Sequence, residues 1–275
     1  MSDGAPILVA IAQTASGPDK RANIDRAVSL VLQAIDMGAR LVALPETFDY
    51  RGTEPDLSRI AEPLPGSALA PLLRLASERD VWILAGSVHE ADPSGGMPYN
   101  TSALISPKGK IAARYRKIHL FDIAIGDRSV TESAKYQSGR EIVSTRVDAL
   151  TVGLTICYDM RFPELYRALA DAGSDLVCVP SSFTAPTGEA HWEILLRARA
   201  VENQCFIIAP GQAGIGAGGI PTYGNSMIID PWGRVLARAS ADSEEVISAT
   251  LDLEEMARIR QHLPALNNRK LPLIR

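Results

Sequence analysis

An internal repeat constrains the fold of this chain more than any other feature of its sequence. Residues 38–48, GARLVALPETF, align without gaps on residues 173–183, GSDLVCVPSSF. Further along, residues 99–114 align without gaps on residues 223–238, with a proline and a glycine in matching places. Because both pairs occur in the same order, duplication explains them better than two chance matches. Each half of the chain is therefore expected to build the same unit.

The repeated unit alternates strands with helices. Apolar runs of strand length predict strands at 7–12, 41–44, 81–85, 102–105, 150–157, 176–179, 205–209, 226–229 and 246–251. Helical spacing of apolar residues predicts helices at 23–37, 68–79, 164–172 and 190–204. The Pro-x-Gly-Lys/Arg segments predict turns between antiparallel strands. We therefore predict an α/β protein, a four-layer α-β-β-α sandwich with an internal pseudo-two-fold duplication.

Charge and cysteine content exclude several classes of function. The formal net charge is −4 and its signs are interspersed, so no basic face favours binding of nucleic acid or of an anionic membrane. Residues 1–13 lack a cationic start, and no later run approaches a membrane span, so we expect a cytoplasmic protein, or an organellar one after removal of a leader. The cysteines form no CxxC pair and no zinc pattern, which predicts reduced thiols and no metal site.

One of the three cysteines stands at the end of a predicted strand. The segment LTVGLTICYDMRFPE alternates apolar with small or polar residues up to Cys157, and Pro163 then suits the first turn of a helix. A thiol between a strand and a helix lies at a sheet edge near backbone N–H groups, which favours a nucleophile. The repeat places Cys178 opposite Ala43 and Cys205 opposite Val81, inside apolar strands, so these two are expected in the core.

Three charged residues also fall near strand ends or in loops. Glu46 follows a buried strand, and the repeat puts Ser181 at the equivalent position, so the acid is not required by the turn itself. Lys117 follows the first hairpin, and Glu132 lies in a loop before Cys157. A thiol nucleophile needs a base, its oxyanion needs a cation or N–H donors, and a leaving amine needs a proton. These residues can meet all three needs.

At these positions the chain resembles the nitrilase, or carbon-nitrogen hydrolase, superfamily, whose members use a Glu-Lys-Cys triad on an α-β-β-α sandwich. The segments LPETF, YRKIHLFD, TES and CYDMRFPEL match its four landmark segments in order. The resemblance implies that Glu46 is the general base, Lys117 the cation at the oxyanion and Cys157 the nucleophile. It also implies that Glu132 positions the lysine and the amide. The backbone N–H of Tyr158 is then the second oxyanion donor.

The resemblance covers essentially the whole chain and implies one carbon-nitrogen hydrolase domain over 1–275. Within the superfamily the sequence looks most like the Nit branch, first the amidases of deaminated glutathione and second the omega-amidases. This implies a small-molecule substrate, with hydrolysis of a terminal carboxamide of a small carboxylic acid to carboxylate and ammonia through a thioester. It also implies the absence of metal and organic cofactors, and a homodimer that buries the helix near 163–172 and the apolar tail. The loop at 123–130 departs from the family pattern, so the acyl group stays open.

Two alternative functions remain at this point. A beta-ureidopropionase-like or aliphatic amidase activity would share the triad but not an acid-binding pocket. A binding protein that keeps the fold without catalysis would be favoured by loss of a triad residue, and all three are present.

Further residues are predicted to shape the substrate pocket, namely Phe48, Arg161, Ser182, Thr184 and Trp192. Arg161 either grips a substrate carboxylate through its fork of donors or forms an ion pair with Asp159 or Glu164. For Glu46 to act as a base, burial beside the strand is expected to raise its pKa.

Overall fold

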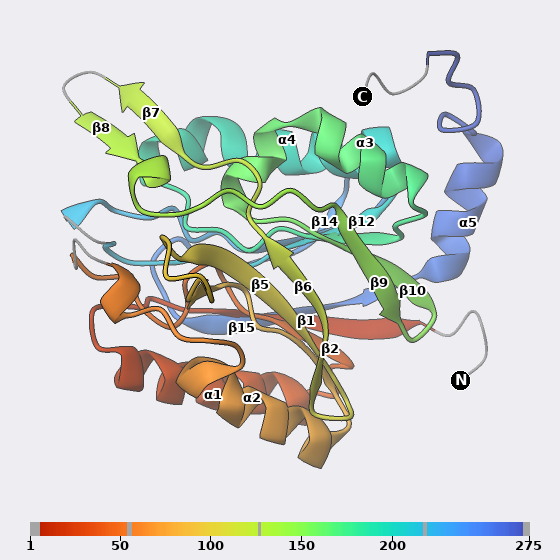
Figure 1. The fold of residues 1–275 in the computed structure, drawn as a ribbon. Coiled ribbons are helices and arrows are strands. Elements are labelled where there is room, and N and C mark those ends of the chain that lie inside the picture. The colour runs from red at the N-terminus through yellow and green to blue at the C-terminus, as the bar shows by residue number, and fades with distance from the viewer. Residues whose placement is uncertain (1–5, 54–56, 126–127, 217–218, 272–275) are drawn as a thin grey trace.

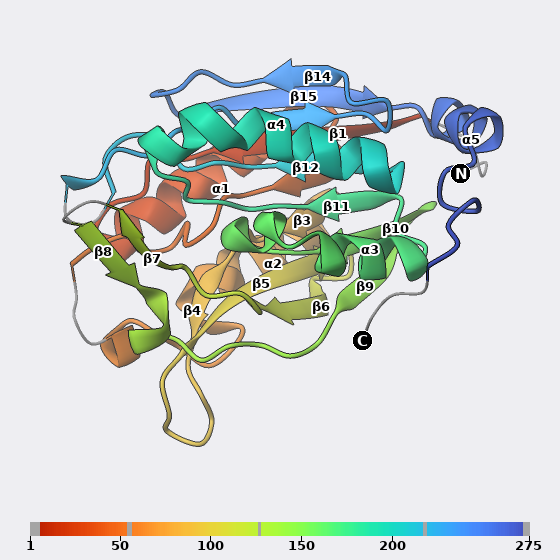
Figure 2. The same ribbon diagram turned by 90° about the horizontal axis from the view of Figure 1, so that it is seen from above.

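Two β-sheets pack face to face and carry helices on both outer faces (Figures 1 and 2). The computed structural model describes residues 6–53, 57–125, 128–216 and 219–271. The first sheet consists of β1 (Ile7–Gln13), β2 (Leu41–Ala43), β3 (Trp82–Leu84), β4 (Val88–Glu90), β5 (Tyr99–Ser106), β6 (Lys110–Arg116) and β15 (Glu245–Leu251). The second consists of β9 (Val143–Val147), β10 (Leu150–Leu154), β11 (Leu176–Cys178), β12 (Phe206–Ala209), β13 (Met227–Ile229) and β14 (Val235–Arg238).

The helices complete the four layers. Their bounds are α1 (Lys20–Asp36), α2 (Gly66–Arg79), α3 (Pro163–Asp171), α4 (Ala185–Asn203) and α5 (Leu253–His262). Helices α1 and α2 cover the first sheet and α3 and α4 cover the second, while α5 lies beside the sandwich (Figure 1). None of the described helices is both long and apolar enough to cross a membrane.

Strand order confirms the duplication and the predicted fold class. In the first half β1, β2 and β3 are parallel, and β5 and β6 then return antiparallel. In the second half β10, β11 and β12 are parallel, and β13 and β14 return antiparallel. The outer neighbour of β1 is the antiparallel β15, just as the antiparallel β9 pairs with β10. Apart from β4, an additional strand of the first sheet that pairs with β5, the two sheets therefore share one topology.

Successive side chains of β1 pack alternately on the two faces of the first sheet. Val9 and Ile11 belong to the core that includes the space between the sheets, and Ala10 and Ala12 face the core beneath α1 and α2. Because successive side chains of a strand point to opposite faces, small alanines on the outer face let the helices approach closely. The sandwich thus has apolar contacts on both faces of its first sheet.

Several element boundaries differ from the predictions. The predicted strand 150–157 ends at Leu154, and Cys157 instead begins a short 3-10 helix, η3 (Cys157–Arg161). Helix α4 begins at Ala185 rather than residue 190, with proline in its first turn. Helix α5 was not predicted, because its sequence LEEMARIRQH is mostly charged or polar and buries only three residues, Leu253, Met256 and Ile259.

A buried carboxylate links the strands β4, β5 and β6. Glu90 is 3% exposed and accepts hydrogen bonds from Thr101 Oγ1 at 2.6 Å, Arg114 Nη1 at 3.0 Å and Arg116 Nη2 at 2.8 Å. Burial alone would raise the pKa of Glu90, but the hydrogen bonds from Arg116 and Thr101 and the charges of both arginines outweigh it and lower the pKa.

This network predicts a loss of stability in acid. Because the Glu90 pKa is lower in the folded state, the unfolded chain binds more protons, and stability falls as the pH drops below about 4.3 and through the folded value. Glu90→Gln is expected to lose part of this dependence when unfolding free energies are compared between pH 7 and pH 3. The exposed substitution Glu254→Gln is the control. An unchanged slope in Glu90→Gln would contradict the prediction.

Candidate active site

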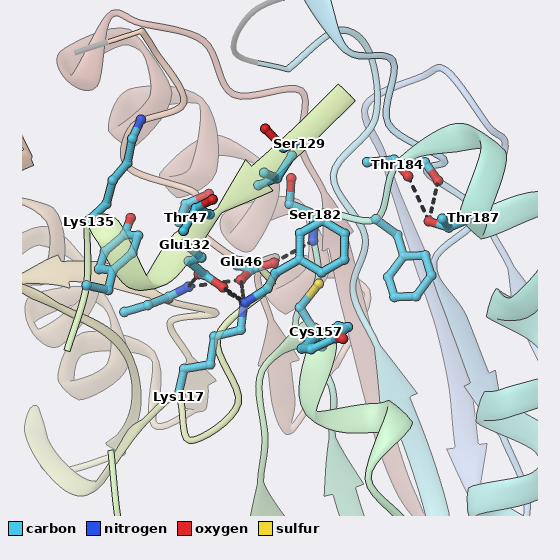
Figure 3. A pocket seen from close by; sticks show the side chains of 17 residues that line it. Glu46, Thr47, Lys117, Ser129, Glu132, Lys135, Cys157, Ser182, Thr184 and Thr187 are labelled. Atoms are coloured by element: carbon cyan, nitrogen blue, oxygen red, sulfur yellow. Dashed lines mark hydrogen bonds and ion pairs between the residues drawn. The ribbon is translucent and has the colours of Figure 1, made fainter. Parts of the chain in front are cut away.

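Three side chains from separate elements meet between the carboxyl ends of the two sheets (Figure 3). Glu46 lies three residues after β2, Lys117 directly follows β6, and Cys157 begins η3 after β10. Lys117 Nζ lies 2.9 Å from Glu46 Oε1, and it lies 2.8 Å from Oε2 of Glu132. Glu132 begins the 3-10 helix η2 (Glu132–Ala134). The structure therefore brings the four predicted residues together, although they span more than a third of the chain.

The backbone at Cys157 holds the thiol in an unusual position. Cys157 has φ +49°, in the left-handed region that costs free energy for a residue with a side chain. The turn is fixed because Cys157 N–H donates to the Pro180 carbonyl at 2.9 Å, and Ile156 N–H donates to Asp159 Oδ2 at 2.9 Å. Asp159 also accepts from Tyr115 Oη at 2.6 Å and is fully buried. This sharp turn, rather than the end of a strand, aims the sulfur into the site.

Two donors besides Lys117 hold the Glu46 carboxylate. Asn100 Nδ2 donates to Glu46 Oε1 at 2.9 Å and also reaches Glu132 Oε1 at 3.3 Å. The backbone N–H of Ser182 donates to Glu46 Oε2 at 2.8 Å. Asn100 was missed by sequence reasoning, although the repeat carries Gly224 at the equivalent position. That asymmetry is the same kind of signal that distinguished Glu46.

The expected rise of the Glu46 pKa is wrong. Burial does raise it, but the charge of Lys117 and hydrogen bonds from Lys117, Cys157 and Asn100 lower the pKa below its ordinary value. The carboxylate is therefore ionised at neutral pH. The carboxylate is thus in the form that can accept a proton, although the lowered pKa makes it a weaker base than burial alone would.

Burial and the Glu46 charge raise the pKa of Cys157 well above that of an ordinary thiol, against the opposing charge of Lys117. The resting residue is therefore a thiol, and a nucleophilic thiolate requires transfer of its proton. Burial would lower the pKa of Lys117, but the charges of Glu132 and Glu46 raise it well above its ordinary value. The site consequently holds one ammonium between two carboxylates, beside a protonated sulfur.

A cavity of about 440 Å³ opens onto these groups. Its lining includes all four predicted polar residues and also three other predicted positions, Tyr158, Ser182 and Thr184. Residues that sequence reasoning did not assign also line it, namely Thr47, Asn100, Phe121, Ser129, Val130, Thr131, Lys135, Tyr136, Phe183 and Thr187.

The segment 123–130, which we expected to be a loop, contains strands, and it contributes to the lining of the cavity. It forms most of a two-stranded hairpin, β7 (Asp122–Ile125) and β8 (Arg128–Thr131). Ser129 and Val130 of β8 line the cavity. Residues 126–127 lie outside the described part of the chain.

Two of the predicted pocket residues lie elsewhere. Phe48 is fully buried in the core between the first sheet and its helices. Trp192 is also fully buried, donates from Nε1 to the Asn225 carbonyl at 2.8 Å, and packs with its ring centre 5.1 Å from that of Phe183. Neither lines the cavity. Both large rings fill the core because the helix layers need apolar volume there, and Trp192 supports the cavity wall only through Phe183.

Arg161 lies behind the cavity wall rather than on it. Its guanidinium carbon is 5.3 Å from the ring centre of Phe183 and 5.8 Å from that of Tyr158, two residues that line the cavity. No described carboxylate lies within 4.0 Å of the guanidinium, so the expected alternative of an ion pair with Asp159 or Glu164 is wrong.

The backbone N–H of Tyr158 is placed to serve a ligand. Cys157 N–H is occupied by Pro180, whereas Tyr158 N–H donates to no acceptor among the described residues. An N–H donor next to a thiol and a buried ammonium is the arrangement that stabilises an oxyanion. Among those residues, no group of three or more His, Cys, Asp and Glu side chains could hold a metal ion.

Comparisons with known proteins place this chain in one class of protein. Residues 8–261 match the carbon-nitrogen hydrolase family, and the chain therefore belongs to that family. It is 40% identical to human deaminated glutathione amidase over 269 residues, which covers 96% of this chain and 82% of the relative. It is 37% identical to human omega-amidase NIT2 over 255 residues, covering 92% and 91%.

A solved structure agrees with these relatives. The crystal structure of Saccharomyces cerevisiae Nit3, a member of branch 10 of the nitrilase superfamily, superposes with a TM-score of 0.88 at 32% identity. The similarity covers 98% of this chain and 99% of Nit3.

Proposed function

We propose that the protein is a cysteine-dependent amidase that hydrolyses a terminal amide of a small carboxylic acid, similar to deaminated glutathione, through a thioester on Cys157. The observation that carries the proposal is the convergence of Glu46, Lys117 and Cys157 on one cavity. The 40% identity to deaminated glutathione amidase supports the choice of substrate class. The proposal treats 1–275 as one carbon-nitrogen hydrolase domain.

The proposed reaction begins with proton transfer from the Cys157 thiol to the ionised Glu46. The thiolate attacks the amide carbon, and the oxyanion is stabilised by Lys117 Nζ and the Tyr158 N–H. Glu46 then protonates the departing amine, the C–N bond breaks and the thioester remains. A water molecule, deprotonated by Glu46, attacks the thioester; the C–S bond breaks, the carboxylate is released, and Glu46 returns the proton to the Cys157 thiolate. Glu132 holds the ammonium in place at 2.8 Å.

A panel of three substrates tests the proposal. Deaminated glutathione, 2-oxoglutaramate and N-carbamoyl-beta-alanine are compared at equal concentration, with the acid product measured by mass spectrometry. The amide nitrogen of deaminated glutathione belongs to cysteinylglycine, so its amine product is the dipeptide, whereas the other two release ammonia. Preference for deaminated glutathione is expected, and preference for 2-oxoglutaramate would identify an omega-amidase.

Two results would overturn this choice. Preference for the carbamoyl substrate would indicate a beta-ureidopropionase-like enzyme. Absence of turnover of all three substrates by a protein that thermal unfolding shows to be folded would indicate a binding protein that keeps the fold.

We also propose a homodimer. Exposed apolar side chains gather on α4 and on the turn and strand that follow β13. Ile194 is 68% and Val201 48% exposed, and Trp232 is 54% exposed. The turn packs on the helix, since Arg197 Nε donates to the Gly233 carbonyl at 2.8 Å. Such a patch is typical of a surface that binds a second copy.

Charge placed in this patch is expected to produce monomers. Trp232→Asp should sediment at half the mass of the parent protein, because a carboxylate cannot be buried in an apolar interface without a partner. The matched change Lys108→Asp at the tip of the other hairpin should leave the mass unchanged. A monomeric parent protein would contradict the proposal. The predictions that the helix near 163–172 and the apolar tail contribute to the interface stay untested, and Leu273 and Ile274 of the tail lie outside the described residues.

We also propose a cytoplasmic location, on the basis of the cysteines. The three cysteines are free, and the proposed nucleophile must stay reduced. Cell fractionation with detection of the protein tests this, and recovery from an oxidising compartment would contradict it.

A further inference from the structure

Lys117 and Cys157 reach the cavity from different sheets (Figure 3). Lys117 directly follows β6 of the first sheet, and Cys157 begins η3 after β10 of the second. Among the described strands, no strand of one sheet pairs with a strand of the other. The distance between the ammonium and the sulfur must therefore be fixed by side-chain and loop contacts between the two segments.

A buried carboxylate joins the two segments. Asp159 lies two residues after Cys157, and His119 lies two residues after Lys117. Asp159 Oδ1 accepts a hydrogen bond from the backbone N–H of His119 at 3.0 Å and lies 2.7 Å from His119 Nδ1. Because a carboxylate accepts hydrogen bonds, Nδ1 carries the proton of this pair. The other oxygen, Oδ2, accepts from Ile156 N–H at 2.9 Å, directly before the residue that bears the sulfur.

Aromatic rings reinforce the same contact. The rings of His119 and Phe162 stack with their centres 3.7 Å apart and their planes at 6°. Phe162 also packs edge-on against Tyr158, at 5.3 Å between ring centres. Tyr158 packs edge-on against Phe121 at 5.0 Å. Two of these rings belong to the segment of Lys117 and two to the segment of Cys157. Since such ring pairs are favourable beyond the area that they bury, the segments are held together at several points.

The His119–Asp159 pair does not belong to the reacting groups. Neither side chain lines the cavity. The charges that act on the pKa of Cys157 are those of Glu46 and Lys117. A Cys-His-Asp triad would need the imidazole beside the sulfur, so this pair does not supply the base. Its contacts instead run along the backbone to both catalytic residues.

We propose that His119 and Asp159 are positioning residues, which fix the Lys117 ammonium relative to the Cys157 sulfur. The inference rests on the proposed function, because the oxyanion of an amidase must lie near both groups. Donors stabilise it only when they are aimed at the place where the charge develops, and a displacement of about 1 Å can cost about a hundredfold in rate. Loss of the His119 hydrogen bond should therefore slow the reaction without weakening substrate binding.

Two substitutions of His119 separate its hydrogen bond from its ring. His119→Phe keeps a ring to stack on Phe162 but removes the Nδ1 donor, and it should lower kcat by about 10- to 100-fold with KM within about threefold. His119→Asn removes the ring but places an amide N–H the same number of bonds from the backbone. It should retain kcat within about fivefold of the parent protein. His119→Ala, which removes both features, should be at least as slow as His119→Phe and replaces it if that variant does not fold.

Trp82→Phe is the matched control. Trp82 Nε1 donates to Asp148 Oδ1 at 3.0 Å, and this bond also joins the first half of the chain to the second. It lies at the opposite end of the strands, because Trp82 begins β3 and Asp148 precedes β10. Trp82→Phe should therefore lower the midpoint of thermal unfolding, as His119→Phe does, but leave kcat within about twofold. A contact that only stabilises the fold would give the same pattern in both variants.

Alkylation of Cys157 by iodoacetamide is a readout that needs no turnover. The charge of Lys117 opposes the rise in the pKa of Cys157, so an ammonium held in place favours the thiolate. His119→Phe should slow alkylation by about threefold or more, whereas Trp82→Phe should not change it. The rate is followed at neutral pH from the mass of the peptide that contains Cys157.

The outcomes separate the positioning role from the proposed function. If the parent protein hydrolyses an amide, a kcat of His119→Phe within about twofold of the parent, or a loss confined to KM, would overturn the positioning role while the amidase stands. If the parent hydrolyses none of the panel, the proposed function fails and alkylation decides. Slower alkylation in His119→Phe alone would then support the positioning role, and equal rates in the parent and both variants would overturn it.

Discussion

Replacing Cys157 by alanine is expected to lower amide hydrolysis by at least about a thousandfold, because the reaction loses its nucleophile while the fold is kept. The side chain is 7% exposed and faces the cavity, so removing the sulfur leaves only a small space there. The measurement is kcat with the best substrate of the panel, together with thermal unfolding to verify the fold.

The other cysteines supply a matched control. Cys178 and Cys205 are buried in or beside strands of the second sheet, and burial raises the pKa of both thiols, that of Cys205 to about 12. Alanine at either position should leave kcat within about twofold and alter only stability. Activity that survives in Cys157→Ala, or that disappears equally in Cys178→Ala, would contradict the assignment.

Replacing Glu46 by glutamine should lower kcat by about 10²- to 10⁴-fold, the usual contribution of a general base. The amide keeps the shape of the side chain but cannot accept the thiol proton. Lys117 keeps its second carboxylate, Glu132 at 2.8 Å, so the ammonium is not left unpaired and the variant should fold. The kcat is measured over pH 5 to 9.

Glu62→Gln is the control for this change. Glu62 pairs with Lys20 at 2.8 Å and does not line the cavity, so its loss should change kcat by less than about twofold. If Glu46→Gln retained more than about a tenth of the parent kcat, the proton acceptor would have to be another group.

The duplicated pattern made the architecture predictable. Four gapless aligned segments implied two like units, and the strand orders on either side of β3 and β12 bear this out. The ends of the strands were less predictable, because a strand stops where a side chain, rather than the neighbouring strand, binds its backbone N–H groups. The apolar run to Ile156 reads as a strand, but Asp159 accepts from Ile156 N–H and converts the end of that run into a turn.

The charged residues of the site were predictable because they break the repeat or match family segments. Glu46 stands where the second half has a serine, and in the structure it forms an ion pair with Lys117. The sign of the Glu46 pKa shift was not predictable, since it depends on the donors Asn100 and Lys117, which come from β5 and the end of β6.

The pocket walls were the least predictable part. Phe48 and Trp192 are aromatic and adjacent to site segments, yet both point into the core. The guanidinium of Arg51 lies beside Gln212, Ala213 and Gly216, which are distant from it in sequence. Contacts of this kind arise from the tertiary fold and leave no periodic signal in the sequence.

The thioester on Cys157 is the central claim, and rapid quenching tests it most directly. Enzyme in excess over substrate is mixed with 2-oxoglutaramate and with deaminated glutathione, quenched in acid within the first turnover, and digested for peptide mass mapping. The account predicts that the peptide containing Cys157 gains the mass of the acyl group, and that this gain decays as the acid product appears. Product formed within the first turnover with no acyl mass on that peptide at any quench time would contradict the account.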